Sequence, residues 1–246
     1  MTDPLPPRTG AGRPLAPTPW QTATVLAIRA ETPNVKTFRL ALAAPSPYLA
    51  GQHYVVRLTA PDGYTASRSY SVASAPDDRG EIDLTVEHLP DGEVSGYLHE
   101  VVEVGDLLEV RGPIGGWFVW EADTPALLVG GGSGVIPLMS MLRLARREGR
   151  GDLVHLVVSA RSPEDLYYRD ELTGPEVTVV HTRVAPPGDL RPPGRLTADD
   201  LAAHVAAAQT AYVCGSTGFT NAASALLTDL GMPVAQIRVE RFGPTG

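Results

Sequence analysis

A glycine-rich stretch in the middle of the chain constrains the fold more than any other part of the sequence. The apolar run "ALLVGG" leads through Gly132, Ser133 and Gly134 into the amphipathic pattern "VIPLMSMLRLARREG". Strand, tight turn and helix in this order are typical of dinucleotide-binding domains, where glycines let the backbone approach a pyrophosphate and the helix start offers amides. Pro137 replaces the third glycine of the usual pattern, and tight packing alone is the alternative explanation of the glycines. We predict a nucleotide phosphate site at this turn, formed by Gly132, Ser133, Gly134 and Pro137.

The rest of the second half repeats the same alternation of strand and helix. Apolar strand patterns are "LVHLVVSA", "VTVVHT", "AYVCG" and "IRVERF", and helical patterns are "PEDLYYRDEL", "LTADDLAAHVAAA" and "TGFTNAASALLTDLG". Such alternation predicts a parallel sheet covered by helices on both faces. We expect a Rossmann-like α/β domain over residues 123–246.

The first half has a different periodicity. From Trp20 to Trp120 the chain shows short alternating runs closed by Pro, Gly and Asp, which is typical of an antiparallel barrel or sandwich. One helix is predicted in "GEVSGYLHEVV", with Val94, Leu98, Val101 and Val102 on one face. We expect a β-barrel domain over residues 19–122, preceded by a Pro- and Gly-rich disordered tail over residues 1–18.

Composition excludes several classes of function. Cys214 is the only cysteine, so the sequence can form no internal disulfide and cannot supply four thiolates to an iron-sulfur cluster. The six histidines show no metal-ligand spacing, and a net charge of −8 argues against a nucleic-acid surface. No apolar stretch approaches membrane-spanning length, and the first residues lack a secretion signal. We therefore expect no metal, no nucleic acid, no membrane span and a cytoplasmic location.

The end of the second strand of the α/β half carries a possible coenzyme determinant. In a dinucleotide domain an acidic residue there suits the ribose of NAD, whereas an arginine suits the extra phosphate of NADP. Here the strand ends in Ser159, Ala160 and Arg161. Arg161 favours NADPH, and the alternative is an exposed arginine paired with Glu164 or Asp165.

The stretch "SRSYSVAS" places an arginine, an aromatic ring and a hydroxyl on one predicted strand. Arg68 offers bidentate bonds to a phosphate, Tyr70 offers a flat apolar surface, and Ser71 offers a small hydroxyl. Taken alone, the pattern also fits an ordinary strand with a surface arginine.

Six motifs together resemble the ferredoxin–NADP reductase superfamily, in its branch of bacterial stand-alone FAD-dependent NAD(P)H oxidoreductases. They span the chain from about Thr22 to its end in the family's order, and they are "RSYS", "GEVSGYL", "RGPIGGWF", "GGGSGVIPL", "VCGSTGF" and "ERFG". The resemblance implies a flavin-binding barrel followed by a nicotinamide-binding domain.

The resemblance also implies roles for the residues of the barrel. Arg68 would contact the flavin pyrophosphate, Tyr70 would pack against the flavin, and Ser71 would hydrogen-bond flavin N5. Ser69 belongs to the same strand motif, and Glu87 and His88 match a strand end that lines the flavin. The flavin phosphates would lie at the start of the capping helix, at Gly92, Val94 and Ser95.

In the second half the resemblance points to the reacting end of the nicotinamide. Cys214 matches a residue near the reacting carbon, with a buried core cysteine as the alternative. Glu240 matches a carboxylate that helps to relay protons, with an ion pair to Arg238 or Arg241 as the alternative. The remaining matched positions are Gly215, Ser216, Phe219 and Phe242, and Ser216 stands where relatives commonly have proline. Ser71, Cys214 and Glu240 are the expected catalytic residues.

The function implied is a FAD enzyme that accepts hydride from NADPH, or NADH, and passes electrons to a separate acceptor. Many relatives fuse an iron-sulfur domain to this module, but one cysteine cannot hold such a cluster, so a separate ferredoxin is the expected partner. The alternatives are a reductase of free flavin, ferric complexes or quinones, and a flavin-carrying subunit of a larger redox complex.

Overall fold

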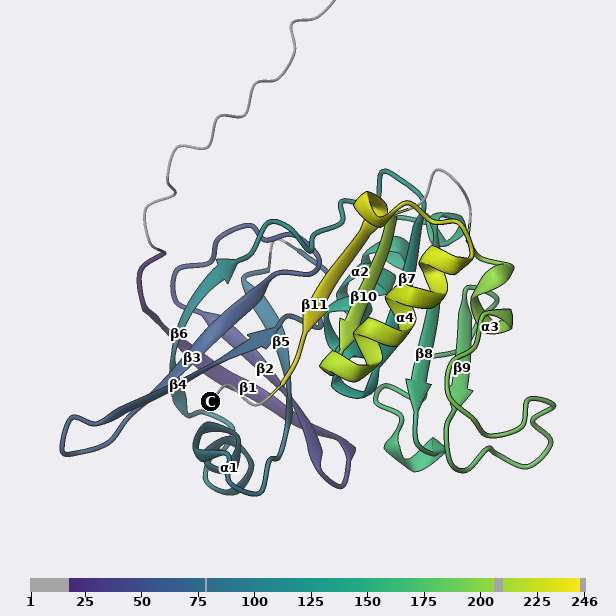
Figure 1. Ribbon diagram of the computed structural model, residues 1–246. Helices are drawn as coiled ribbons and strands as arrows, with labels where there is room; N and C mark the ends of the chain where they lie inside the picture. The colour runs from purple at the N-terminus through teal and green to yellow at the C-terminus, as the bar shows by residue number, and fades with distance from the viewer. Residues whose placement is uncertain (1–17, 78, 206–209, 244–246) are drawn as a thin grey trace, which may run out of the picture.

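Two halves with different sheets lie side by side in the computed structural model of the chain, which describes residues 18–77, 79–205 and 210–243 (Figure 1). The predicted disordered tail, except for its last residue, lies outside the described residues. Each half has its own architecture.

The first half is an antiparallel six-stranded sheet in the order β4-β3-β6-β1-β2-β5. An isolated bridge between Val72 and Leu84 joins its two edges and closes it into a barrel. The alternating apolar residues of each strand fill the interior, as Ile82, Leu84 and Val86 do. The elements are β1 (Gln21–Thr32), β2 (Val35–Leu42), β3 (His53–Thr59), β4 (Thr65–Ser71), β5 (Glu81–Glu87), α1 (Glu93–Glu100) and β6 (Leu107–Ile114).

The second half is a parallel five-stranded sheet in the order β11-β10-β7-β8-β9. Helix α2 packs on the face toward the barrel, and α3 and α4 pack on the other face. The elements are β7 (Ala126–Gly131), α2 (Val135–Arg147), β8 (Val154–Ala160), β9 (Val177–His181), α3 (Asp199–Ala202), β10 (Thr210–Gly215), α4 (Thr217–Asp229) and β11 (Ile237–Arg241). Short 3-10 turns are η1 (Gly132–Gly134), η2 (Gly151–Leu153), η3 (Pro163–Asp165) and η4 (Val234–Gln236).

The predicted fold class is therefore confirmed: an antiparallel barrel with one capping helix precedes a parallel sheet with helices on both faces. One hydrophobic cluster joins the two halves, because Ala50, Ala73 and Trp120 of the first pack with Leu138 and Met139 of α2. Within the described ranges, no helix combines the length and the apolar character needed to cross a bilayer.

Two predicted helices are wrong or much shorter than expected. Residues 163–172 form only the turn η3 and an irregular segment, in which Tyr168 has a left-handed φ of 55°. Tyr168 is turned toward the barrel, where its hydroxyl donates to Thr85 Oγ1 at 2.5 Å, so a long-range contact overrides the local helical pattern. The helix predicted over 196–208 is limited to α3 among the described residues, and its last residues, 206–208, lie outside them.

The capping helix is correct in position but ends earlier than its apolar pattern. Val94, Leu98 and Val102 are buried as predicted. Val101 follows the last residue of α1 and is 53% exposed, so its predicted place on the buried face is wrong.

Candidate functional site

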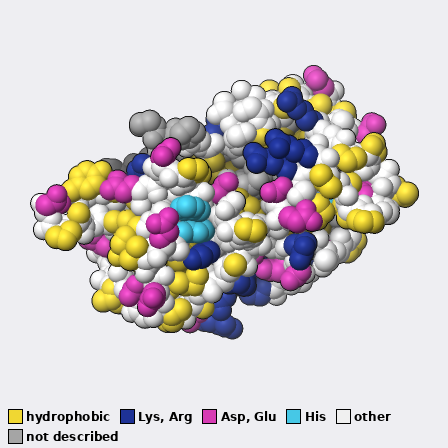
Figure 2. Space-filling view, turned by 90° about the horizontal axis from the view of Figure 1, so that it is seen from below, with side chains coloured by type: hydrophobic (Ala, Val, Ile, Leu, Met, Phe, Trp, Pro, Cys, Tyr) yellow, Lys and Arg dark blue, Asp and Glu magenta, His cyan; other side chains and the backbone are white. Residues whose placement is uncertain are grey.

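The connections of the parallel sheet change direction between β7 and β10, and we call the region at the carboxyl ends of the strands at this switch point the crevice. Strand β7 connects through α2 to β8 on one side, whereas its other neighbour, β10, connects through α4 to β11. Ligands of open α/β sheets bind at the carboxyl ends of the strands at such a switch point. Figure 1 shows β8 and β9 pointing toward the lower side of the molecule, and Figure 2 views the molecule from that side.

Three glycines bring the two loops of this crevice into contact. A Cβ at Gly134 would lie 2.1 Å from the carbonyl oxygen of Cys214, and one at Gly131 would lie 2.7 Å from the ring of Phe219. Gly215 has a φ of 151° and contacts the same ring. Gly132 has a left-handed φ of 56° with open space where a Cβ would stand, so its backbone is free for a close approach. The predicted phosphate turn therefore lies directly against the predicted nicotinamide loop.

The start of α4 is held by a side chain that the family commonly lacks. Ser216 is the N-cap of α4, and its hydroxyl accepts a hydrogen bond from the Phe219 amide at 3.3 Å. Serine is a favourable N-cap residue. The Ser216 hydroxyl therefore fixes the start of α4 by a side-chain hydrogen bond.

Cys214 and Glu240 lie at the same position of neighbouring strands β10 and β11. Cys214 is fully buried, and burial raises the pKa of its thiol well above the usual range. Burial also raises the pKa of Glu240 to about 7. Its Oε2 atom is buried and has no hydrogen-bond partner in the described part of the chain. The alternative ion pairs are not formed: Arg238 donates to backbone oxygens of the 117–119 segment, and Arg241 to Asn221.

The predicted flavin strand approaches this crevice from the barrel. Ser71 ends β4 and is buried, Tyr70 is half-buried against the barrel core, and Arg68 and Ser69 are exposed. Burial raises the pKa of Tyr70 to about 12, so its ring stays neutral. Within the described residues, the only hydrogen bond of the Arg68 side chain goes to the adjacent carbonyl of Ser67, at 2.8 Å. The Arg68 guanidinium is therefore available for an anion.

Helix α1 presents an open N-terminus close to this strand. Its N-cap residue is Gly92, and no side chain caps it. Ser95 Oγ instead accepts from the Leu89 amide at 3.3 Å and donates to the Gly92 carbonyl at 3.2 Å. Val94 is buried under the turn. The uncapped backbone amides at the start of α1 can bind an anion. The predicted contact between the Ser95 hydroxyl and a flavin phosphate would require that hydroxyl to rotate away from its present partners.

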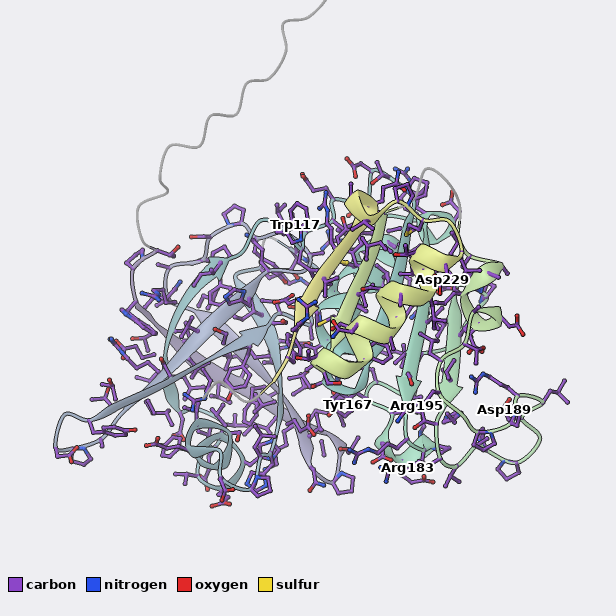
Figure 3. All side chains as sticks on the ribbon, in the orientation of Figure 1. Trp117, Tyr167, Arg183, Asp189, Arg195 and Asp229 are labelled. Atoms are coloured by element: carbon purple, nitrogen blue, oxygen red, sulfur yellow. The ribbon has the colours of Figure 1, made fainter. Side chains whose placement is uncertain are left out.

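Glu87 and His88 lie at the end of β5, on the border between the two halves. Glu87 is exposed. It lies close to Tyr167, a residue of the second half, whose pKa is raised first by burial and then by the charge of the Glu87 carboxylate. His88 is half-buried, with its Nε2 atom 3.4 Å from a Glu100 carboxylate oxygen and its ring 5.1 Å from that of His99. Figure 3 places Tyr167 between the two halves.

The carboxyl ends of β8 and β9 bring three arginines together, of which the sequence indicated only one. Ser159 is buried, and Arg161 directly follows β8. The carbonyl of Arg161 accepts a hydrogen bond from the Arg183 amide at 2.9 Å. The Gly194 amide donates to a carbonyl at the end of β9, so the next residue, Arg195, lies beside that strand end. No side chain of these three arginines forms an ion pair or hydrogen bond in the described structure, including the alternative pairs of Arg161 with Glu164 or Asp165. Figure 3 shows Arg183 and Arg195 on the lower side, and Figure 2 shows a cluster of basic side chains there.

Two of the predicted residues lie at the margin of the crevice. Phe242 packs against the cluster that joins the halves, and its amide donates to the Gly215 carbonyl at 2.9 Å. Pro137 is buried in the first turn of α2, where its missing amide proton costs no helical hydrogen bond. Pro137 is buried and Phe242 is partly buried, so both contribute to the packing beneath the crevice.

The residues of the crevice and the barrel fit a flavin and a nicotinamide dinucleotide. The free guanidinium of Arg68 and the uncapped start of α1 suit a pyrophosphate, and Tyr70 supplies a flat neutral ring. The open backbone at Gly132 and the start of α2 suit a second pyrophosphate. Among the described residues, no group of three or more potential metal ligands is present.

Comparisons with known proteins agree with this assignment. Residues 22–119 match the family "Oxidoreductase FAD-binding domain", and residues 128–225 match "Oxidoreductase NAD-binding domain". The chain is 32% identical over 233 residues to the ferredoxin–NAD(P)+ reductase component of the naphthalene 1,2-dioxygenase/salicylate 5-hydroxylase systems of Ralstonia sp., covering 91% of this chain and 69% of that protein.

Two further similarities cover 61% and 97% of the chain, respectively. Ferredoxin–NADP reductase B of Sorangium cellulosum is 39% identical over 154 residues, which is 61% of this chain and 62% of that protein. The crystal structure of a cytochrome P450 reductase from Amycolatopsis superimposes with a TM-score of 0.77 at 27% identity, covering 97% of this chain and 74% of that one. The chain therefore belongs to the FAD- and NAD-binding oxidoreductases of the ferredoxin reductase type.

Proposed function

We propose that this protein takes hydride from NADPH onto a bound FAD and passes the electrons singly to a separate ferredoxin. The observation that carries the proposal is the crevice at the switch point of the parallel sheet, where the 132–134 turn meets Cys214 and the helix that follows this turn packs with Ala73, just after the predicted flavin strand of the barrel. When bound, the flavin supplies the chemistry, because it accepts two electrons together and releases them one at a time.

The protein's own contribution is binding, orientation and control of one proton. Arg68 and the start of α1 would hold the flavin pyrophosphate, while Tyr70 would pack against the ring and Ser71 would donate to its N5 edge. On the other side, Gly132 and the start of α2 would hold the nicotinamide dinucleotide. Cys214, as a neutral buried thiol, would limit where the nicotinamide ring can lie.

Glu240 is proposed to hold and release a proton beside the reacting rings. Its buried carboxylate oxygen has no partner in the described structure, and its pKa is raised to about 7. A carboxyl group with a pKa near the working pH suits proton transfer. The group therefore exchanges its proton with little change in free energy at neutral pH.

A preference for NADPH over NADH forms part of the proposal. Arg161, Arg183 and Arg195 lie together at the ends of β8 and β9, and none has an acidic partner in the described part of the chain. Free guanidinium groups suit a phosphate ester, whereas the 2′-hydroxyl of NADH has no charge to neutralise. The name of the Sorangium relative includes NADP.

The acceptor is proposed to be a ferredoxin because the sequence has one cysteine and cannot itself supply the four thiolates of a cluster. The Ralstonia relative is named for ferredoxin, and it is a component of oxygenase systems. We also propose that the domains divide at residues 122/123, between β6 and β7, and that the protein works in the cytoplasm, where NADPH is available.

The acceptor is tested by steady-state oxidation of NADPH with purified protein. A [2Fe-2S] ferredoxin with cytochrome c as the final oxidant should raise the rate at least about tenfold over cytochrome c alone. Equal or faster turnover with free FMN, ferric citrate or a quinone would favour a small-molecule reductase. Turnover only in the presence of a co-purifying protein would favour a subunit of a larger complex.

A further inference from the structure

Helix α2 of the second half is attached to the barrel by a row of side chains on one of its faces. Residues three and four positions apart lie on the same face of a helix. The row donates to three carbonyl oxygens of the segment just after β4: Ser140 Oγ to Ser74 at 2.6 Å, Arg143 Nη1 to Ala73 at 2.8 Å, and Arg147 Nη1 to Pro76. The segment that receives these bonds begins two residues after Ser71.

Arg143 is the centre of this attachment. Its Nε and Nη2 atoms donate to the two carboxylate oxygens of Glu171 at 2.8 and 2.5 Å, and its guanidinium lies 4.9 Å from the ring centre of Tyr168. Its side chain is only 16% exposed, whereas that of Glu171 is 37% exposed, so the arginine side of this forked ion pair is the one shielded from water. The Tyr168 hydroxyl continues the network into the barrel by donating to Thr85 Oγ1.

The same helix begins at the glycine turn of the crevice. Gly134 is its N-cap residue, so α2 runs without interruption from the dinucleotide side of the crevice to the row that holds residues 73–76. A helix of 13 residues is about 20 Å long and stiff on the scale of an atomic contact. The distance between the two ring sites is therefore set by how α2 is fixed to the segment behind Ser71.

We propose that Arg143 is a positioning residue for hydride transfer: it touches neither ring, but it fixes α2 against residues 73–76 and thereby sets the distance between nicotinamide and flavin. This inference rests on the proposed function. Hydride transfer requires the donor carbon and the acceptor nitrogen to lie about 3–3.5 Å apart, and a displacement of about 1 Å can cost two orders of magnitude in rate.

Arg146 provides a matched control on the same helix. Its three hydrogen bonds go to the Glu176 carboxylate and to the carbonyls of Glu171 and Thr173, all within the second half. Arg143→Met and Arg146→Met thus remove the same group from the same helix, and each breaks a forked interaction. Only Arg143→Met breaks a bond between the halves.

The experiment compares flavin reduction by saturating NADPH in a stopped-flow spectrometer under anaerobic conditions. For Arg143→Met we expect the limiting rate to fall about 10- to 100-fold, with FAD content and the Kd of NADP+ within about threefold of wild type. The perturbation of the flavin absorbance by NADP+ should also change in amplitude, which reports the ring contact without any turnover. Arg146→Met should keep the limiting rate and the spectrum, and Arg143→Lys should recover part of the rate.

Several outcomes would overturn the positioning role. Equal rates and spectra in the two methionine variants would do so, as would an unchanged limiting rate with a weaker Kd for NADP+, or loss of FAD from Arg143→Met. If Arg143→Met does not fold, Ser140→Ala removes one bond of the row, and an unchanged limiting rate and spectrum there would contradict the proposal. Absence of NADPH-driven reduction in the wild-type protein would instead contradict the proposed function.

Discussion

The thiol of Cys214 and the carboxylate of Glu240 are register partners on the parallel strands β10 and β11. Their side chains share the face of the sheet that is turned toward α2 and the barrel, because residues paired in register project to the same side. Burial raises the pKa of both groups, and the Glu240 charge further raises that of Cys214, so the thiol stays neutral while the Glu240 carboxyl, with a pKa of about 7, is partly ionised near neutral pH. The floor of the crevice therefore carries one exchangeable proton near neutral pH and no permanent charge.

Glu240→Gln should remove a pH dependence of electron transfer to the acceptor. The carboxyl group of Glu240 has a pKa of about 7, so it holds a proton below this pH and loses it above. If it supplies that proton, the limiting rate of the wild-type protein should fall above pH 7, while the variant should be slower and flat between pH 6 and 8. An inflection near pH 7 that persists in Glu240→Gln would assign the proton to another group.

Arg161→Ala should weaken the use of NADPH far more than that of NADH. Loss of one charge-assisted bond to a phosphate corresponds to about 1.5–3 kcal/mol, or about 10- to 150-fold in kcat/KM. Arg183→Ala should give a loss of the same kind, because its backbone is bonded to that of Arg161.

Arg169→Ala is the control for the coenzyme prediction, since Arg169 is an exposed arginine in the segment after Arg161. This variant should leave the ratio of kcat/KM for NADPH to kcat/KM for NADH unchanged. Equal losses with NADPH and NADH in Arg161→Ala would contradict the phosphate assignment.

Arg68→Ala should yield protein depleted of FAD. The guanidinium is exposed and holds no acidic partner in the described structure, so its removal should cost little stability but should weaken the pyrophosphate contact. Flavin content is read from the absorbance of the purified protein, with Arg79→Ala as the control because Arg79 is a highly exposed arginine of the same half. A fully loaded Arg68→Ala protein would refute the role.

A pair of stacked histidines predicts a loss of stability in acid. The rings of His155 and His204 lie 3.4 Å apart, and burial, followed by the His204 charge, lowers the pKa of His155 to about 4. The unfolded chain binds this proton below about pH 6.5, whereas the folded chain does not bind it until about pH 4. The stability contribution should therefore be fully present above pH 6.5 and fall as the pH decreases to 4, by about 1 kcal/mol because solvent screens the partly exposed ring.

The histidine prediction is measured by urea unfolding of the wild-type protein and of His155→Gln at several pH values. The glutamine keeps a polar atom for the Thr178 hydroxyl, which His155 Nε2 contacts at 2.9 Å. The difference in unfolding free energy between the two proteins should shift in favour of His155→Gln as the pH falls. A constant difference from pH 7 to pH 4.5 would show that the stack does not oppose protonation.

The fold could be predicted where local sequence decides it. Alternation in the barrel strands and the strand-glycine-helix order at residues 126–147 both express short-range periodicity, and both were predicted correctly. The segment 163–172 was not, because Tyr168 adopts a left-handed conformation to reach Thr85 and Glu31 of the other half. A contact between residues so far apart in the sequence cannot be predicted from the local pattern of the segment.

The sequence can indicate the candidate site only where its residues lie close together in short motifs. Residues in short motifs, such as Arg68 to Ser71, can be found from their order alone. Arg183 and Arg195 could not, because they approach Arg161 only through the pairing of β8 with β9 and a loop that folds back on β9. The attachment by Arg143 was also missed, since its partners lie 70 residues earlier and 28 residues later in the chain.

The most direct test of the central claim is an anaerobic titration of the purified protein, followed by its absorbance spectrum. NADPH should bleach the flavin bands with one equivalent of coenzyme per flavin, NADH should do so more weakly, and added oxidised ferredoxin should restore the bands. A protein that contains no flavin and cannot be reconstituted with FAD, or one whose flavin NADPH leaves unchanged, would contradict the account.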